Sequence, residues 1–124
     1  MTTPLLVAVA LAGACGAVAR LLLSRALFGF GGELPLATAV VNVVGCLLFG
    51  LAVAAFGARW SPTVQAAVLA GFLGAFTTFS TFAFEAVELA TAGRWLTACM
   101  HITIHNVLGL TALVAGRHLG RLLA

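Results

Sequence analysis

Four long apolar segments, separated by short polar stretches, make up most of the chain. They contain no Lys or Arg and cover residues 5–19, 36–56, 64–90 and 96–116. The first extends towards Leu23 if Arg20 is accommodated in it. Each can cross a hydrocarbon core, which takes roughly 20 apolar residues. The pattern therefore predicts an all-α integral membrane protein, with four transmembrane helices in a single domain of residues 1–124.

The third segment is the longest, and its pattern is unlike that of an uninterrupted helix. Between Gly71 and Glu85 it contains two glycines, four hydroxyl side chains and five phenylalanines. Glycine weakens a helix, and Ser and Thr side chains compete for its backbone hydrogen bonds. We therefore expect this helix to be broken in mid-membrane. Because a bilayer tolerates non-helical backbone only where protein buries it or a wet cavity adjoins it, the break predicts a site or a pore.

The composition agrees with this class and excludes a soluble domain. Hydrophobic residues make up 63% and charged residues 7% of the chain, and the mean hydropathy is +1.20. No Lys or Arg precedes the first apolar segment, so we expect it to stay in the mature protein and not to act as a signal peptide. The three cysteines, an odd number within apolar segments, predict no disulfide framework. No nucleic-acid partner is expected.

The arginines are divided evenly between the two sides of a four-span chain. Positive charge on cytoplasmic loops normally orients a membrane protein, so an even division predicts insertion in both orientations. Two oppositely oriented copies can pair about a two-fold axis as a dual-topology antiparallel homodimer, with the site at their interface. The alternative is an accidental balance, or a partner protein that sets the topology. One side carries Arg20, Arg25 and Arg94, and the other carries Arg59, Arg117 and Arg121.

Polar side chains within the apolar segments carry the functional information, because each costs free energy unless it is satisfied. The second segment contains Asn42, with Thr38 one turn earlier. In the third segment Phe79 and Phe82 are three residues apart and share a helix face, which Glu85 continues. The hydroxyl side chains around these rings are Thr77, Thr78, Ser80 and Thr81.

Neutral donors and aromatic edges are suited to a small anion. An aromatic ring is positive at its edge, and amide and hydroxyl groups donate hydrogen bonds. The central parts of the second, third and fourth segments hold no Lys or Arg, so an anion would be held weakly enough to leave, as conduction requires. The alternative is a core of packed phenylalanines, with hydroxyls bonded to carbonyls one turn back. The break and the buried Asn42 favour the anion path.

Three motifs in this chain resemble those of the Fluc/CrcB fluoride channels, which are small four-span proteins. The third-helix pattern G-x-x-T-T-F-S-T-F occupies residues 74–82 and is highly specific. Two weaker motifs agree with it, and the resemblance covers essentially the whole chain. They are T-x-x-x-N-x-x-G at Thr38, Asn42 and Gly45, and G-x-x-G-A-x-x-R at Gly13, Gly16, Ala17 and Arg20.

This resemblance implies a passive, fluoride-selective channel that spans the cell membrane several times. Cytoplasmic fluoride would leak out through it, which lowers fluoride toxicity. The resemblance also implies a dual-topology antiparallel homodimer with two separate pores. The implied partners are therefore a second copy of the chain, fluoride and the lipid bilayer.

The resemblance also implies roles for individual residues. Phe79 and Phe82 match the two rings whose edges line the fluoride path, and Asn42 matches the asparagine of the pore. Gly74 and Thr77 match residues whose backbone carbonyls, from both subunits, hold a structural sodium ion that is not transported. The further candidates for the fluoride path are Thr38, Ser80, Thr81, His101 and His105.

The fourth segment departs from the family pattern, which has a tyrosine and then a serine four residues later. Aligned on Gly109, these positions hold His101 and His105. Two histidines on one helix face are a poor metal site, because Cys99 points elsewhere and no acid is expected nearby. Neutral imidazoles could line the path, whereas protonated ones would hold fluoride strongly and make conduction depend on pH. The departure also leaves open a paralogue as the second subunit.

Three charged residues in or near the spans have a structural and a functional interpretation. Arg20 either snorkels to the lipid headgroups or lines a vestibule that concentrates anions. Glu85 and Glu88 lie near the end of the third span. We expect both to be solvated there, with no part in conduction, because an acidic vestibule opposes anions.

Other classes of protein fit less well. Small multidrug exporters use a buried glutamate in their first helix, and the first segment here has no acid. A non-conducting scaffold would use the buried Asn and hydroxyls only as contacts between helices. An enzyme is not expected, because the sequence shows no nucleophile with a base and no metal cluster.

Overall fold

The computed structural model describes residues 2–30 and 34–124, and these residues are helical with short connections. Four helical stretches are long and apolar enough to cross a membrane, which confirms the predicted fold class. The third stretch, Pro62–Thr91, consists of several shorter elements. In chain order the elements are α1 Thr3–Ala26, α2 Leu36–Phe56, α3 Pro62–Gln65, η1 Ala66–Leu73, α4 Gly74–Phe76, α5 Phe79–Thr91 and α6 Trp95–Leu122.

The helices extend beyond the apolar windows at both ends of the chain. The first helix, α1, reaches Ala26, so Arg20 is accommodated within it. The last helix, α6, continues to Leu122 through the polar end of the chain. The turn before α6 contains Gly93 at φ 76°, a left-handed conformation that glycine adopts without strain.

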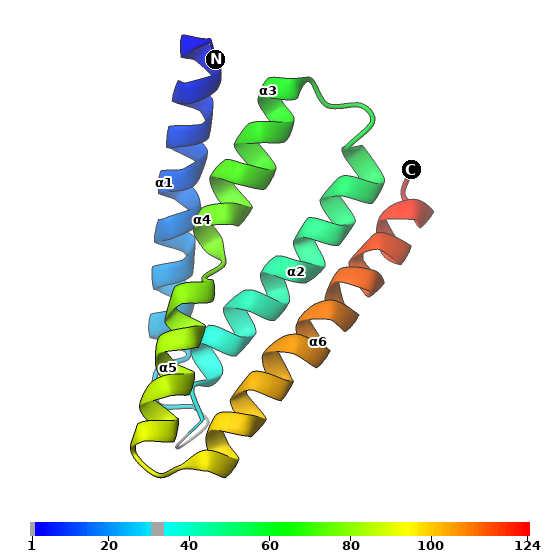
Figure 1. Cartoon of the computed structure of the whole chain (residues 1–124). Helices are drawn as coiled ribbons and strands as arrows, with labels where there is room; N and C mark the ends of the chain where they lie inside the picture. The colour runs from blue at the N-terminus through cyan, green and yellow to red at the C-terminus, as the bar shows by residue number, and fades with distance from the viewer. Residues whose placement is uncertain (1, 31–33) are drawn as a thin grey trace.

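The four stretches form two close helix pairs (Figure 1). In one pair α2 lies along α6, and in the other α1 lies along η1 and α4. Glycines make both contacts possible. A Cβ atom added at Gly16 would overlap the Phe72 carbonyl, and one added at Gly116 would overlap the Leu47 carbonyl. Small residues let backbones approach in this way in membrane proteins, where close packing replaces the hydrophobic effect.

The two pairs differ in how much of their surface is covered within the chain. In α2, 28% of the apolar window is buried, whereas in α1 only 6% is buried. Large apolar side chains on α1, among them Leu11 and Leu22, are more than half exposed. Lipid suits such a surface, and the protein is therefore a multi-pass membrane protein.

The third stretch contains two irregularities. The helix is interrupted at Thr77 and Thr78, which have extended backbones with φ/ψ of −84°/159° and −148°/113°. The predicted break is therefore confirmed. Earlier in the stretch, η1 is a π-helix of eight residues that the sequence pattern did not predict. Gly71 lies within this irregular helix and packs against α1, where an added Cβ would lie 2.8 Å from the Val9 carbonyl oxygen.

Candidate functional site

The break is formed by two threonines that end one helix and begin the next. The Thr77 N–H and hydroxyl both donate to the Leu73 carbonyl oxygen, each at 3.0 Å, and close the first half of the span. The Thr78 hydroxyl accepts the Thr81 N–H at 3.2 Å and thereby caps α5. A Thr side chain that replaces a helical hydrogen bond in this way stabilises a helix start.

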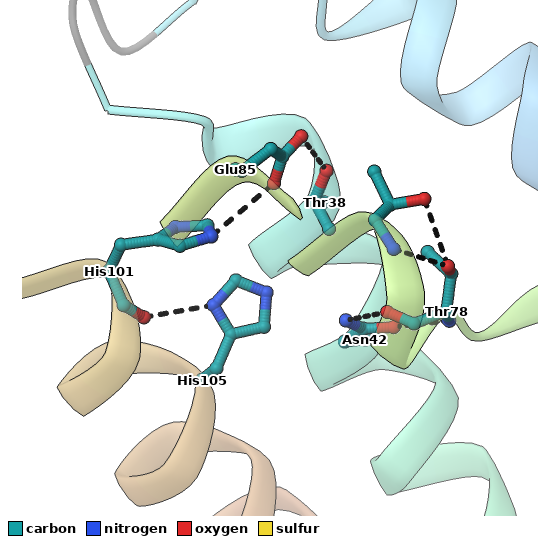
Figure 2. Close-up of polar contacts among 7 residues, drawn as sticks. Thr38, Asn42, Thr78, Glu85, His101 and His105 are labelled. Carbon is teal, nitrogen blue, oxygen red and sulfur yellow. Dashed lines mark hydrogen bonds and ion pairs between the residues drawn. The ribbon is translucent and has the colours of Figure 1, made fainter. Parts of the chain in front are cut away.

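Asn42 on α2 holds the broken backbone from the side. Its Nδ2 donates to the Thr78 carbonyl oxygen at 2.9 Å, and its Oδ1 accepts the Thr78 N–H at 2.8 Å (Figure 2). Both backbone groups of Thr78 are thus satisfied by one amide, as unpaired peptide groups in a bilayer require. The second N–H of Nδ2 is left for another acceptor.

The break also releases backbone carbonyls from the helical pattern. The N–H that would reach the Gly74 carbonyl belongs to Thr78 and goes to Asn42 instead. The N–H that would reach the Thr77 carbonyl belongs to Thr81 and goes to the Thr78 hydroxyl. Gly74 and Thr77 are the two positions that the family resemblance implies as carbonyl ligands of a sodium ion.

Arg20 satisfies a third carbonyl at the break. Its Nε donates to the Ala75 carbonyl oxygen at 3.1 Å, so α1 reaches across to the end of α4. This contact turns Arg20 towards the protein, so the side chain does not simply snorkel to the headgroups. No sequence pattern marks a side chain that will bond to a backbone group more than 50 positions away, since only the fold brings them together.

A cavity of about 360 Å³ adjoins the break. Its lining combines amide, hydroxyl and ring groups and includes no Asp, Glu, Lys or Arg. Thr38, Ser80, Thr81 and His101 do not line it. The predicted site residues on its wall are Asn42, Thr77, Phe79, Phe82 and His105, joined by Thr78, Cys46 and Asn106.

The two phenylalanines of the motif lie side by side on α5. Their ring centroids are 5.5 Å apart with planes tilted by 60°. Phe82 also contacts the rings of His105 and His101, with centroids 4.4 Å and 5.4 Å away. Phe79 is 78% exposed, so the chain itself leaves most of this ring uncovered.

The hydroxyls after the break form a small network around Thr78. The Thr78 hydroxyl donates to Thr81 Oγ1 at 3.0 Å, and Ser80 Oγ lies 3.4 Å from the same group. The Thr81 hydroxyl therefore keeps its own proton for another acceptor.

Glu85 is not the solvated residue that we expected, and the expectation that no acid lies near the histidines was wrong. The Thr38 hydroxyl donates to Glu85 Oε1 at 2.7 Å, and His101 Nε2 lies 3.3 Å from Glu85 Oε2 (Figure 2). The Glu85 side chain is 22% exposed and that of His101 is fully buried. From the sequence alone, we expected Glu85 to lie near the end of the third span. The fold turns it towards α2 and α6.

The two histidines contact each other on α6. His105 Nδ1 lies 3.0 Å from the His101 carbonyl oxygen, and the two ring centroids are 4.3 Å apart in an edge-to-face arrangement. Across the residues that the structure describes, no group of three or more His, Cys, Asp or Glu is placed to hold a metal ion.

Fold and site together define a class of protein. Four spans, one of them interrupted beside a cavity whose mainly apolar wall carries a few hydrogen-bonding groups, characterise a small integral membrane protein that handles an ion or a small solute at a broken helix. Residues 7–117 match the family model described as "CrcB-like protein, Camphor Resistance (CrcB)", and the chain belongs to this family.

Curated relatives are similar over nearly their whole length. A protein of Solidesulfovibrio magneticus is 45% identical over 118 residues, which cover 93% of this chain and 94% of the relative. One from Maridesulfovibrio salexigens is 39% identical and one from Desulforapulum autotrophicum is 42% identical, with the same coverage. All three are named fluoride-specific ion channel FluC, a class of transport protein and not of enzyme.

Proposed function

We propose that this protein is a passive, fluoride-selective channel that lets cytoplasmic fluoride leave the cell and so lowers its toxicity. The observation that carries the proposal is the cavity at the break, whose wall combines hydrogen-bond donors with the rings of Phe79 and Phe82 and includes no Asp, Glu, Lys or Arg. Relatives that carry the name of a fluoride channel support it, because their similarity covers 93% of this chain.

Fluoride is strongly hydrated, so its path must replace the water that it loses. The second N–H of Asn42, on the wall of the cavity, is not used by the hydrogen bonds of the break. The hydroxyl proton of Thr81, which lies outside the cavity, is also unused and could serve a continuation of the path. The edges of Phe79 and Phe82 add weak positive potential. Because the lining holds no ammonium or guanidinium group, the anion is released as readily as it is bound.

The proposal includes a second copy of the chain in antiparallel orientation. Phe79 is mostly exposed within one chain although it lies beside the cavity. A second copy would cover this ring and close the path. The even division of arginines supports insertion in both orientations, as an antiparallel pair needs. A paralogue in the opposite orientation would serve equally.

A structural sodium ion fits the released carbonyls of the break. Carbonyl oxygens are hard ligands, and the carbonyls of Gly74 and Thr77 are not taken by the N–H groups that would bind them in a continuous helix. Two copies would supply both carbonyls twice. A fixed cation there would supply positive potential that favours an anion nearby without being transported.

Reconstitution of the purified protein into liposomes tests the function directly. Vesicles loaded with potassium fluoride and potassium chloride are expected to release fluoride, measured with an ion-selective electrode, only after a potassium ionophore relieves the membrane potential. Chloride should stay inside. Release of both ions, or fluoride release that needs no ionophore, would contradict a selective passive channel. No release under any condition would favour the scaffold.

The orientation is tested in cells. C-terminal fusions to reporters that are active on only one side of the membrane should both give a signal if the chain inserts both ways. A signal from a single side would refute the dual-topology homodimer and leave pairing with a paralogue.

A further inference from the structure

Glu85, His101 and His105 form a buried polar cluster that the proposed path leaves unexplained. His105 lines the cavity at the break, and Glu85 lines a second cavity of about 230 Å³ near the start of α6. His101 is fully buried and contacts both partners. The cluster therefore lies between the two cavities.

Several atoms of this cluster lack hydrogen bonds although they are buried. Among the described residues, Glu85 Oε2 and His105 Nε2 have no hydrogen-bond partner. His101 Nε2 lies within ion-pair distance of Glu85 Oε2. Buried polar atoms are nearly always paired, because each unpaired one retains its full desolvation cost. Their concentration in one place points to an exchangeable ligand.

The position of His105 determines what it offers to an anion. Its Nδ1 faces the His101 carbonyl oxygen, which can only accept, so Nδ1 carries the proton. In the neutral ring Nε2 is then a lone pair, which repels an anion. One added proton turns Nε2 into a donor and gives the ring a positive charge.

We propose that Glu85, His101 and His105 form a proton-operated gate between the two cavities, which passes a small anion only when the histidine pair holds an additional proton. The inference rests on the proposed anion channel and specifies its regulation. The gate binds two ligands, a proton from water and the anion that accepts a hydrogen bond from the new N–H. Glu85 lies 3.3 Å from His101 Nε2 and offsets part of the charge added to the pair, so the anion is held less tightly than by an isolated cation. The Thr38 hydroxyl holds Glu85 in place.

The other titratable groups around the pair are few. The helices that pack on α6 are α2 and α5. Helix α2 contains no charged residue, and its one titratable side chain, Cys46, lines the larger cavity. On α5 Glu88 is exposed, and it lines the smaller cavity together with Arg94. Glu85 is the acid that lies beside the histidines.

The gate predicts a pH profile for ionophore-dependent fluoride release. Between about pH 8 and about pH 5, where imidazoles change charge, release from wild-type vesicles should rise by up to about tenfold per pH unit. The ionophore-dependent component excludes leakage of hydrofluoric acid, which is neutral. His105→Gln should conduct without dependence on pH. Glu85→Gln should move the profile to lower pH, because the protonated pair loses its counter-ion.

One variant serves as a matched control. His118 is exposed on α6, the helix that carries His101 and His105, and lines neither cavity. His118→Gln should keep the wild-type profile. A wild-type profile that is flat, or one that persists in His105→Gln, would overturn the gate and leave the channel intact. Absence of fluoride release at every pH would overturn both.

A second measurement needs no ion flow. Nitrogen NMR of protein labelled at its histidines should show one ring protonated at Nδ1 at high pH, and its signal should disappear in His105→Gln. The ring whose signal is lost in His105→Gln should gain a second proton on acidification. If that ring were protonated at Nε2 in place of Nδ1 at high pH, or gained no second proton between about pH 8 and about pH 5, the gate would be refuted.

Discussion

The two halves of the third span are held in different ways. The half before the break, residues 62–76, packs on α1, and the half after it, α5, packs on α6 (Figure 1). The first half contacts its partner through backbone at glycines such as Gly16 and Gly71. The second half is held by side chains: Thr38 of α2 donates a hydrogen bond to Glu85, and the ring of Phe82 contacts the ring of His105 of α6. One span thus serves two partners with different chemistry.

The break allows both contacts to exist. In a continuous helix the directions of all side chains are fixed relative to one another, so the glycine surface and the polar surface could not turn towards different neighbours independently. The extended residues Thr77 and Thr78 change the direction of the helix axis and rotate one half relative to the other. Asn42 and Arg20 from the neighbouring helices then satisfy the exposed peptide groups of Thr78 and Ala75.

The backbone contact of the first half is expected to be the most sensitive feature. In Gly16→Ala the new Cβ would overlap the Phe72 carbonyl, and backbone cannot yield as a side chain does. Overpacking of this kind costs about 3 kcal/mol, which outweighs the gain of about 1 kcal/mol in helix propensity. The net loss of about 2 kcal/mol should appear as a lower midpoint of thermal unfolding in detergent.

Gly13→Ala is the matched control one turn away on α1. Its Cβ would meet the Gly71 carbonyl oxygen at 3.7 Å, an ordinary contact. The helix-propensity gain then acts alone, and the variant should be slightly more stable than wild type. Equal effects of the two substitutions would show that close backbone contact does not hold the first half.

The contact of the Asn42 side chain with the backbone of the break is expected to have the next largest effect on stability. Asn42→Ala removes the partner of both Thr78 backbone groups. Each unsatisfied buried group costs about 1–3 kcal/mol, and water admitted by the smaller side chain recovers part of this, leaving about 1.5 kcal/mol. Fluoride release should be lost as well, because the break is no longer held. The free energy of unfolding and the rate of fluoride release are measured on the same reconstituted preparation.

Asn106 provides the comparison, because it also lines the cavity but donates to Ile102 of its own helix. Asn106→Ala should change stability by less than about 0.5 kcal/mol, as exposed substitutions usually do. If Asn106→Ala were as destabilising as Asn42→Ala, the bidentate contact would have no special part in the break.

The sequence predicted those features that depend on local pattern. Four apolar segments gave the four spans, and hydroxyls clustered at Thr77 and Thr78 gave the break, because both signals lie within one stretch of chain. The π-helix, the contact of Arg20 with Ala75 and the burial of Glu85 were not predicted. Each depends on the angle at which two distant helices meet, and no local pattern contains that angle.

The smallest expected difference lies in the N-caps with which the two halves begin. Ser61 Oγ accepts the Val64 N–H at 3.4 Å at an exposed site, and Thr78 Oγ1 accepts the Thr81 N–H at 3.2 Å at a partly buried one. Ser61→Ala should cost about 0.5 kcal/mol and Thr78→Val about 1 kcal/mol, because water replaces only the exposed cap. Only Thr78→Val should slow fluoride release, since it changes the start of α5 beside the cavity. If Ser61→Ala slowed release equally, the two halves would act as one unit and the comparison between them would fail.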